Sequence, residues 1–242
     1  MNTNQQDPRI ARGMKTQLAR LHERLAAGEK SIGWKLSFSS PDRMRKFGLK
    51  APLTGFLTDK AVVASGTLIS LAGWTKAIAE PEIAVHIGSD LPYGADREAV
   101  KRAIKGIGPA IELADSVRPS ENVEQILAGN ISQRGVVLGP CDTTRAGGRL
   151  NGVRARVSRN GKEIVDTTDP EALPGELIGL VGCVADRLAE CGEMLRAGQV
   201  IITGSIVPPL VVAAAGEDIV FDLDPIGTVS IRFLAKPGAL CA

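Results

Sequence analysis

The sequence has few aromatic residues. Phe, Trp and Tyr make up 3% of its 242 residues, against 44% hydrophobic residues in all, so the core must be built from Ala, Val, Ile and Leu. A ligand would find no obvious stacking clamp; the candidates are Trp34, Phe38 and Trp74. An excess of charge of one sign is also missing. The net charge is +2 with Lys and Arg scattered along the chain, which argues against a nucleic-acid partner.

Histidine and paired cysteine are scarce as well. His22 and His86 are the only histidines, so a His-dependent catalytic triad is not expected. The cysteines form no CxxC pair and have no histidine nearby, which argues against zinc and predicts reduced thiols in the cytoplasm. They are Cys141, Cys183, Cys191 and Cys241.

Long apolar runs and a phosphate-binding loop are absent from the sequence. The longest apolar run, "IVPPLVVAAA", is too short to span a bilayer and contains two prolines. The start, "MNTNQQDPR", has no apolar stretch of the kind that secretory signals carry. No glycine-rich loop opens a helix, so a Rossmann fold is not expected. We therefore expect a cytoplasmic protein with no membrane partner.

Hydrophobic periodicity predicts a short helical segment, residues 1–30, followed by one α+β domain, residues 31–242. The helices are expected at 8–27, 40–48, 94–108, 120–129 (with Ser120 as N-cap) and 175–191. Strands are expected as short pieces over 53–87, at 109–115, 135–139, 199–205, 217–223 and 227–234, and as a hairpin over 153–167 turning at Asn160-Gly161.

Two carboxylates interrupt the apolar stretch "AIAEPEIAVHIG". In a strand, Glu80 and Glu82 point to the same face, where two like charges repel and are costly to desolvate unless a cation lies between them. Glu112 supplies a third carboxylate in the apolar segment "PAIELAD". On an adjacent strand it would complete a set of three oxygen ligands for a hard divalent cation such as Mg²⁺. The alternative is three unconnected, exposed strand residues.

Other polar residues stand in apolar surroundings. In "GWKLSFSS", Lys35 in a partly desolvated cleft would orient a carboxylate or polarise a carbonyl, although a strand lysine that reaches solvent fits the same pattern. The remaining candidates, which ordinary turns would also explain, lie in the same segment, in "FLTDK" and in "ITGS". Ser39, Ser40, Thr203 and Ser205 are candidates for binding the substrate, and Asp59 is a candidate for proton transfer.

Together these segments resemble the 2-keto-4-pentenoate hydratase / 4-oxalocrotonate decarboxylase group of the fumarylacetoacetate hydrolase superfamily. The similar segments run in family order from about residue 31 to 233: "IGWKLSFSS", "PLTGFLTD", "EPEIAVHIG", "GPAIELADS", "ILAGNISQRGVVLG", "LAECGEMLRAGQVIITGS" and "EDIVFDLDPIGTVSIRF". The resemblance implies a mixed β roll with an enclosed helix and an N-terminal helical part. It implies Mg²⁺ or Mn²⁺ on Glu80, Glu82 and Glu112, and active-site roles for Lys35 and Asp59.

The resemblance also implies a reaction and partners. The expected substrate is a small 2-oxo acid, and the expected enzyme is a lyase that adds water to a 2-hydroxy-2,4-dienoate to give a 4-hydroxy-2-oxo acid in the catabolism of aromatic-ring cleavage products. The main alternative is a 4-oxalocrotonate-type decarboxylase; an acylpyruvase-like hydrolase using His22 and a non-catalytic partner subunit remain open. A homo-oligomer, or a complex with a paired pathway enzyme, is expected.

Two positions depart from the family pattern. Relatives often carry Arg directly after the "ADS" triplet, where this chain has Val117 followed by Arg118. Many hydratases carry an "NHP"- or "GNP"-like turn before the long C-terminal helix, where this chain has "LPGEL" with Glu176. The second segment approaches the substrate in relatives, so these departures concern the identity of the substrate more than the metal site.

Overall fold

A computed structural model describes residues 7–116, 121–212 and 216–234. Its larger sheet has eight strands. Their order is β2 (Leu53–Thr58), β1 (Ser31–Ser37), β10 (Val200–Ser205), β5 (Ala77–Ile87), β6 (Ile104–Asp115), β7 (Gln133–Leu138) and β3 (Val62–Val63), with β11 (Leu210–Val211) also paired to β5. The smaller sheet contains β4 (Leu68–Ser70), β13 (Gly227–Leu234), β12 (Asp218–Asp224), β8 (Arg154–Arg159) and β9 (Lys162–Thr167).

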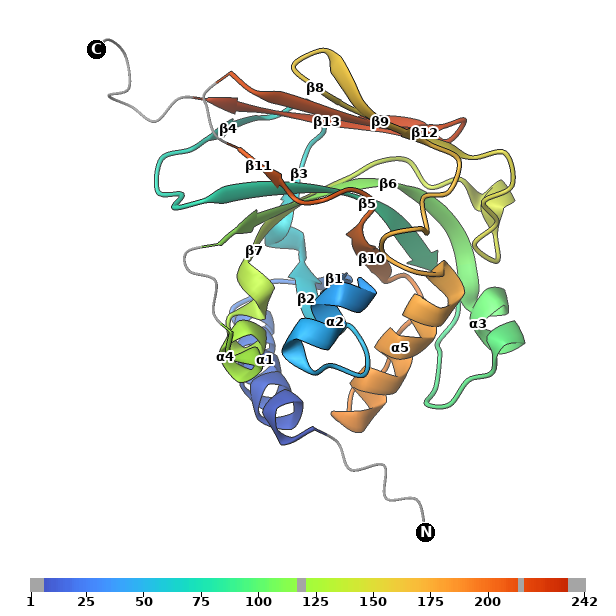
Figure 1. Ribbon diagram of the computed structural model, residues 1–242. Coiled ribbons are helices and arrows are strands. Elements are labelled where there is room, and N and C mark those ends of the chain that lie inside the picture. Colours follow the sequence, from blue (N-terminus) through green and yellow to red (C-terminus); the bar gives the residue numbers. More distant parts are fainter. Residues whose placement is uncertain (1–6, 117–120, 213–215, 235–242) are drawn as a thin grey trace.

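The five α-helices of the described residues lie on one side of the larger sheet, and the smaller sheet lies on the other (Figure 1). They are α1 (Pro8–Ala26), α2 (Pro41–Phe47), α3 (Arg97–Ala103), α4 (Val123–Ala128) and α5 (Leu177–Glu190). Three short 3-10 turns are η1 (Asp59–Ala61), η2 (Asn130–Ser132) and η3 (Thr143–Arg145). The predicted α+β class with curled sheets is confirmed. None of the described helices combines the length and the apolar character needed to cross a bilayer.

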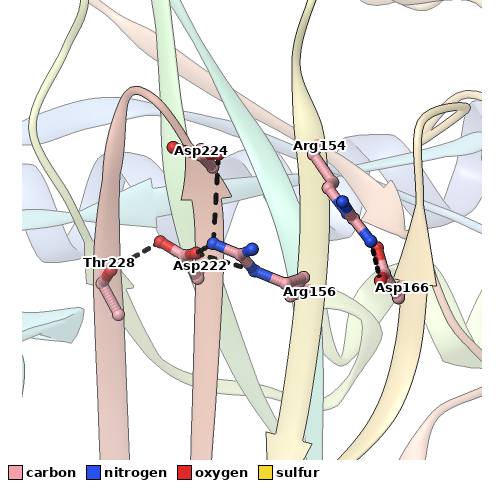
Figure 2. A network of polar contacts seen from close by, with 6 residues as sticks. All are labelled: Arg154, Arg156, Asp166, Asp222, Asp224 and Thr228. Carbon is pink, nitrogen blue, oxygen red and sulfur yellow. Dashed lines mark hydrogen bonds and ion pairs between the residues drawn. The ribbon is translucent and has the colours of Figure 1, made fainter.

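In the smaller sheet, buried and charged residues alternate along a strand because its two faces have different surroundings. Ala155 and Val157 of β8 are buried toward the larger sheet, whereas Arg154 and Arg156 point to the outer face. Figure 2 shows how that outer face pairs its charges: Arg156 bridges to Asp222 of β12, and Arg154 bridges to Asp166 of β9. Such cross-strand pairs fix register and polarity, and each contributes little stability because it is exposed.

The predicted hairpin is confirmed. Asn160 and Gly161 have φ values of 54° and 71°, and a type I′ turn requires positive φ at both positions. The N-terminal helix is also where periodicity places it, and its buried residues Ile10, Met14, Leu18 and Leu21 belong to the main core. The division at residue 30 stays a prediction. The described cysteines Cys141, Cys183 and Cys191 are free; Cys241 lies outside the described residues.

Three predicted boundaries were wrong. The helix expected over 94–108 ends at Ala103, because the chain continues as β6, which pairs with β5 from residue 104 to 115. A Cβ at Gly108 would lie 2.2 Å from the carbonyl oxygen of Pro140, so this strand runs against a neighbouring backbone. The last of the short strands expected over 53–87 is instead the 11-residue β5. Helix α4 is capped by Asn122, and Ser120 lies outside the described residues, as do Val117 and Arg118.

Candidate active site

Three carboxylates meet where β5 and β6 pair. Glu80 lies directly opposite Glu112 in the antiparallel register, and Glu82 follows two residues later on the same face of β5. One oxygen of each carboxylate lies within 4.8 Å of the others. Glu82 and Glu112 are buried, and Glu80 is half-buried. The predicted convergence of these three side chains is therefore what the structure shows.

The three carboxylates share an unfavourable electrostatic environment. Burial raises the pKa of Glu112 to about 7, and the charge of Glu80 adds to the increase. Burial, followed by the charges of Glu112 and Glu80, raises the pKa of Glu82 well above its usual value. Burial also raises the pKa of Glu80. Three carboxyl groups with raised pKa values in one place are typical of a site that binds a cation.

Lys35 reaches the same carboxylates from another strand. Its ammonium donates to Glu112 Oε1 and lies 3.4 Å from the Ile131 carbonyl oxygen, and its side chain is fully buried. In the sheet order, β1 is separated from β6 by β10 and β5, which is about 14 Å across a flat sheet. The contact therefore requires the sheet to curl, so that side chains on the inner face of the roll meet across it.

The donor set fits a hard divalent cation. Glu112 Oε2 is buried and has no hydrogen-bond partner among the described residues, so one ligand atom is free to bind. Glu82 Oε2 accepts a hydrogen bond from the Gly204 backbone N–H at 2.7 Å, which orients that carboxylate. Carboxylate oxygens alone, without sulfur or imidazole nitrogen, favour Mg²⁺, Ca²⁺ or Mn²⁺.

A pocket of about 260 Å³ opens beside Glu80 and Glu82. Its walls are mainly apolar, with polar groups contributed by the loop after β1 and by the end of β10. The residues that line it include Leu36, Phe38, Ser39, Ser40, Arg43, Leu173, Gly204, Ser205, Val207, Pro208 and Pro209. Leu173 belongs to the segment that departs from the family pattern, so that segment reaches the pocket, while Glu176 pairs with Arg97.

The predicted substrate-binding residues divide into two groups. Ser39, Ser40 and Ser205 line the pocket, although the Ser40 hydroxyl also accepts from the Arg43 backbone N–H as the N-cap of α2. Thr203 does not line it. Its buried hydroxyl donates to the Ile83 carbonyl oxygen at 3.1 Å, which is a structural role between β10 and β5. The expectation that Thr203 binds substrate stays a prediction, and this hydrogen bond does not support it.

Asp59 is not brought to the pocket. It follows β2 four residues after Gly55, the register partner of Lys35, which corresponds to about 13 Å along a strand. Its carboxylate accepts from the Lys30 backbone N–H at 2.8 Å, and this hydrogen bond lowers the pKa of Asp59. The role of Asp59 in proton transfer stays a prediction, and this hydrogen bond does not support it.

The two histidines also lie away from the carboxylates. His22 is exposed on α1 and pairs with Glu193 at 2.9 Å. His86 is on β5, four residues beyond Glu82, and burial lowers its pKa. Among the described residues, no histidine lines the pocket. The residue that sequence reasoning missed is Arg43, which lines the pocket and stacks on Phe38, 5.4 Å from the ring centroid.

Comparison with known proteins identifies the family of the chain. The profile of the fumarylacetoacetate (FAA) hydrolase C-terminal family matches residues 38–234, so the chain belongs to that family. The 2-hydroxyhexa-2,4-dienoate hydratase of Comamonas testosteroni is 33% identical over 219 residues, which cover 88% of this chain and 82% of that protein. The 4-oxalocrotonate decarboxylase of Pseudomonas putida is 29% identical over 210 residues, with coverage of 86% and 79%.

A solved structure of similar architecture carries a metal. The 4-oxalocrotonate decarboxylase from Pseudomonas putida G7, complexed with magnesium and adipate, matches with a TM-score of 0.84 and 26% identity. The match covers 93% of this chain and 86% of that one. The same decarboxylase complexed with calcium and acetate matches with a TM-score of 0.83. The predicted superfamily and its hydratase and decarboxylase relatives are thus confirmed.

Proposed function

We propose that this protein is a divalent-metal-dependent lyase that adds water to a 2-hydroxy-2,4-dienoate and yields a 4-hydroxy-2-oxo acid. The observation that carries the proposal is the convergence of Glu80, Glu82 and Glu112 beside a mainly apolar pocket. The apolar walls suit the hydrocarbon end of a monocarboxylate dienoate. The 33% identity to a 2-hydroxyhexa-2,4-dienoate hydratase supports the same reaction.

The three carboxylates would hold the cation, and the pocket would hold the substrate next to it. Mg²⁺ or Mn²⁺ bound there would supply a Lewis acid for the carboxylate and 2-oxo oxygens of the substrate. Lys35 contributes a fixed positive charge beside Glu112, so it stabilises negative charge that develops on the 2-oxo oxygen. Protonation at one carbon of the dienol then gives an enone, and water adds at C4.

Other residues of the pocket orient Glu82, bind the substrate and exclude water. Gly204 fixes the orientation of Glu82 through its backbone N–H, and the Ser39 and Ser205 hydroxyls lie on the pocket wall, where they can bind polar atoms of the substrate. The apolar side chains of Leu173 and Val207 limit the access of water to the hydrocarbon end.

The proposal also includes a cytoplasmic location, a homo-oligomeric state and association with a paired pathway enzyme.

Decarboxylation of a 2-oxo diacid is the second candidate, and Arg43 favours it. This arginine lines the pocket and acts electrostatically on Glu80, so it could pair with a second carboxylate on the substrate. The same electron sink that serves hydration would permit loss of CO₂ from a carboxylate vinylogous to the oxo group. The hydrolase alternative is weakened because its expected histidine base, His22, pairs with Glu193 and does not line the pocket.

The deciding experiment is a screen of 2-hydroxydienoates and 4-oxalocrotonate-like diacids with added Mg²⁺ or Mn²⁺, measuring both hydrated product and CO₂. We expect metal-dependent hydration that a chelator abolishes. CO₂ release from a diacid, with no hydrated product from any dienoate, would instead establish the decarboxylase. Turnover of neither substrate type by the metal-loaded protein would overturn the lyase proposal and favour the hydrolase or partner-subunit alternatives.

A further inference from the structure

Three consecutive residues in η2 adopt the left-handed backbone conformation. The φ values of Asn130, Ile131 and Ser132 are 51°, 51° and 60°. A β-branched residue such as Ile131 rarely occupies this region, because its Cβ crowds the backbone. Backbone strain of this kind persists only where the surroundings hold it, and it concentrates near functional sites. The contacts that hold this turn are therefore relevant to the carboxylate site.

The side chain of Asn130 holds the turn against another strand. Its Oδ1 accepts from the Phe56 N–H at 2.8 Å, and its Nδ2 donates to the Phe56 carbonyl oxygen at 3.0 Å. Phe56 lies on β2, at one edge of the larger sheet, and the turn directly precedes β7 near the opposite edge. The two hydrogen bonds therefore tie the ends of the curled sheet together and satisfy backbone groups that an edge strand leaves unpaired.

Gly55 gives both Asn130 and Lys35 the room that this arrangement needs. Gly55 is the register partner of Lys35. A Cβ at this position would lie 2.9 Å from Asn130 Oδ1 and 2.9 Å from Lys35 Cγ. Because Gly55 has no side chain, the lysine stem and the asparagine amide can both lie close to this position.

The strained turn presents a carbonyl to the lysine. The Ile131 oxygen lies 3.4 Å from Lys35 Nζ, and the other acceptor of this fully buried ammonium among the described residues is Glu112. We propose that Asn130 is a positioning residue: by closing the roll on Phe56, it holds the Ile131 carbonyl where it fixes the Lys35 ammonium toward the carboxylate site. This inference rests on the proposed function of Lys35.

Chemical labelling tests the positioning without any substrate. Acetic anhydride modifies accessible lysines, and mass spectrometry gives the rate at Lys35 relative to exposed Lys60. We expect Asn130→Ala to raise the relative rate at Lys35 about tenfold. The matched control is Gln17→Ala, which removes another buried amide that donates to a backbone carbonyl, that of Leu127, at 2.9 Å. An unchanged rate in Asn130→Ala, or an equal rise in the control, would overturn the proposal.

A double-mutant cycle tests the link to turnover. We expect Asn130→Ala to lower kcat about tenfold while KM and the Mg²⁺ affinity stay within twofold, and to have no further effect once Lys35→Met is present. Equal losses in both backgrounds would contradict the assignment. If Asn130→Ala does not fold, Asn130→Asp keeps the acceptor for the Phe56 N–H, removes the donor, and should show the same pattern more weakly. If the wild-type protein turns over no substrate, the labelling result still decides the positioning.

Discussion

Replacing Glu82 by Gln should stabilise the metal-free protein and destroy its response to metal. The substitution keeps the shape of the side chain and an oxygen that can accept from the Gly204 N–H. It removes one of the charges that repel each other around the site. Most substitutions of buried residues destabilise, so a gain in stability would be a specific sign of this electrostatic conflict.

The neighbouring carboxyl of Glu112 gives the scale of the free-energy cost of burying such a charge. Raising the pKa of Glu112 from 4.5 to about 7 corresponds to about 3 kcal/mol against the ionised form. Burial and the charges of Glu112 and Glu80 oppose ionisation of Glu82, so removing this charge should stabilise the metal-free protein by about 1 to 3 kcal/mol near pH 8, and each kcal/mol raises Tm by about 2 to 4 °C in a chain of this length. Added Mg²⁺ at a hundred times its Kd should stabilise the wild-type protein by about 2.7 kcal/mol and the variant by much less.

The assay is thermal unfolding at pH 8 over a Mg²⁺ titration that starts in chelator. The two Tm curves should cross, with the variant more stable at the low-metal end and the wild-type protein gaining with each addition. Glu163→Gln, which makes the same change at an exposed position of β9, should follow the wild-type curve. A variant that is less stable without metal, or that keeps the full Mg²⁺ response, would refute a shared cation site.

Other predictions concern the lysine, the arginine and pH. Lys35→Met should lower kcat/KM at least about 100-fold and leave Mg²⁺ binding intact, as calorimetry can measure. Arg43→Gln should weaken binding of a 2-oxo diacid about tenfold relative to a 2-oxo monoacid, whereas Arg45→Gln, whose guanidinium pairs with Asp42, should not change that ratio. In chelator, denaturation should show stability falling as pH rises from 4.5 to about 7, because folded Glu112 retains its proton over this range and the unfolded chain does not; a flat profile would contradict the raised pKa.

Local patterns were sufficient to predict the elements whose signals are local. The alternation of charged and buried residues in β8 and the Asn160-Gly161 pair identify the hairpin, and four apolar residues at helical spacing identify α1. The pattern was misleading over 94–108. Val100, Ile104 and Ile107 match a helical period, but the chain becomes a strand after Ala103, because β5 supplies a partner for the whole of β6.

The site was predictable where its residues share one strand or neighbouring strands. Glu80, Glu82 and Glu112 could be placed together because strand alternation and pairing with an adjacent strand are short-range rules. Arg43 was missed, because the local pattern predicts helix α2 but not its place beside Glu80 in the pocket. The Asp59 assignment stays a prediction: Asp59 lies near Lys35 in the sequence pattern, but β2 carries it to the other end of the strand pair.

The curl of the larger sheet connects these observations. The face of β5 that bears Glu80 and Glu82 continues with Ala84, and the face of β6 that bears Glu112 continues with Ala110. Both alanines belong to a small apolar cluster that is separate from the main core. Larger side chains there would keep opposite walls of the roll apart and Lys35 out of reach of Glu112. The main core, between the two sheets and around the helices, carries the stability that lets the roll hold mutually repelling charges in its interior.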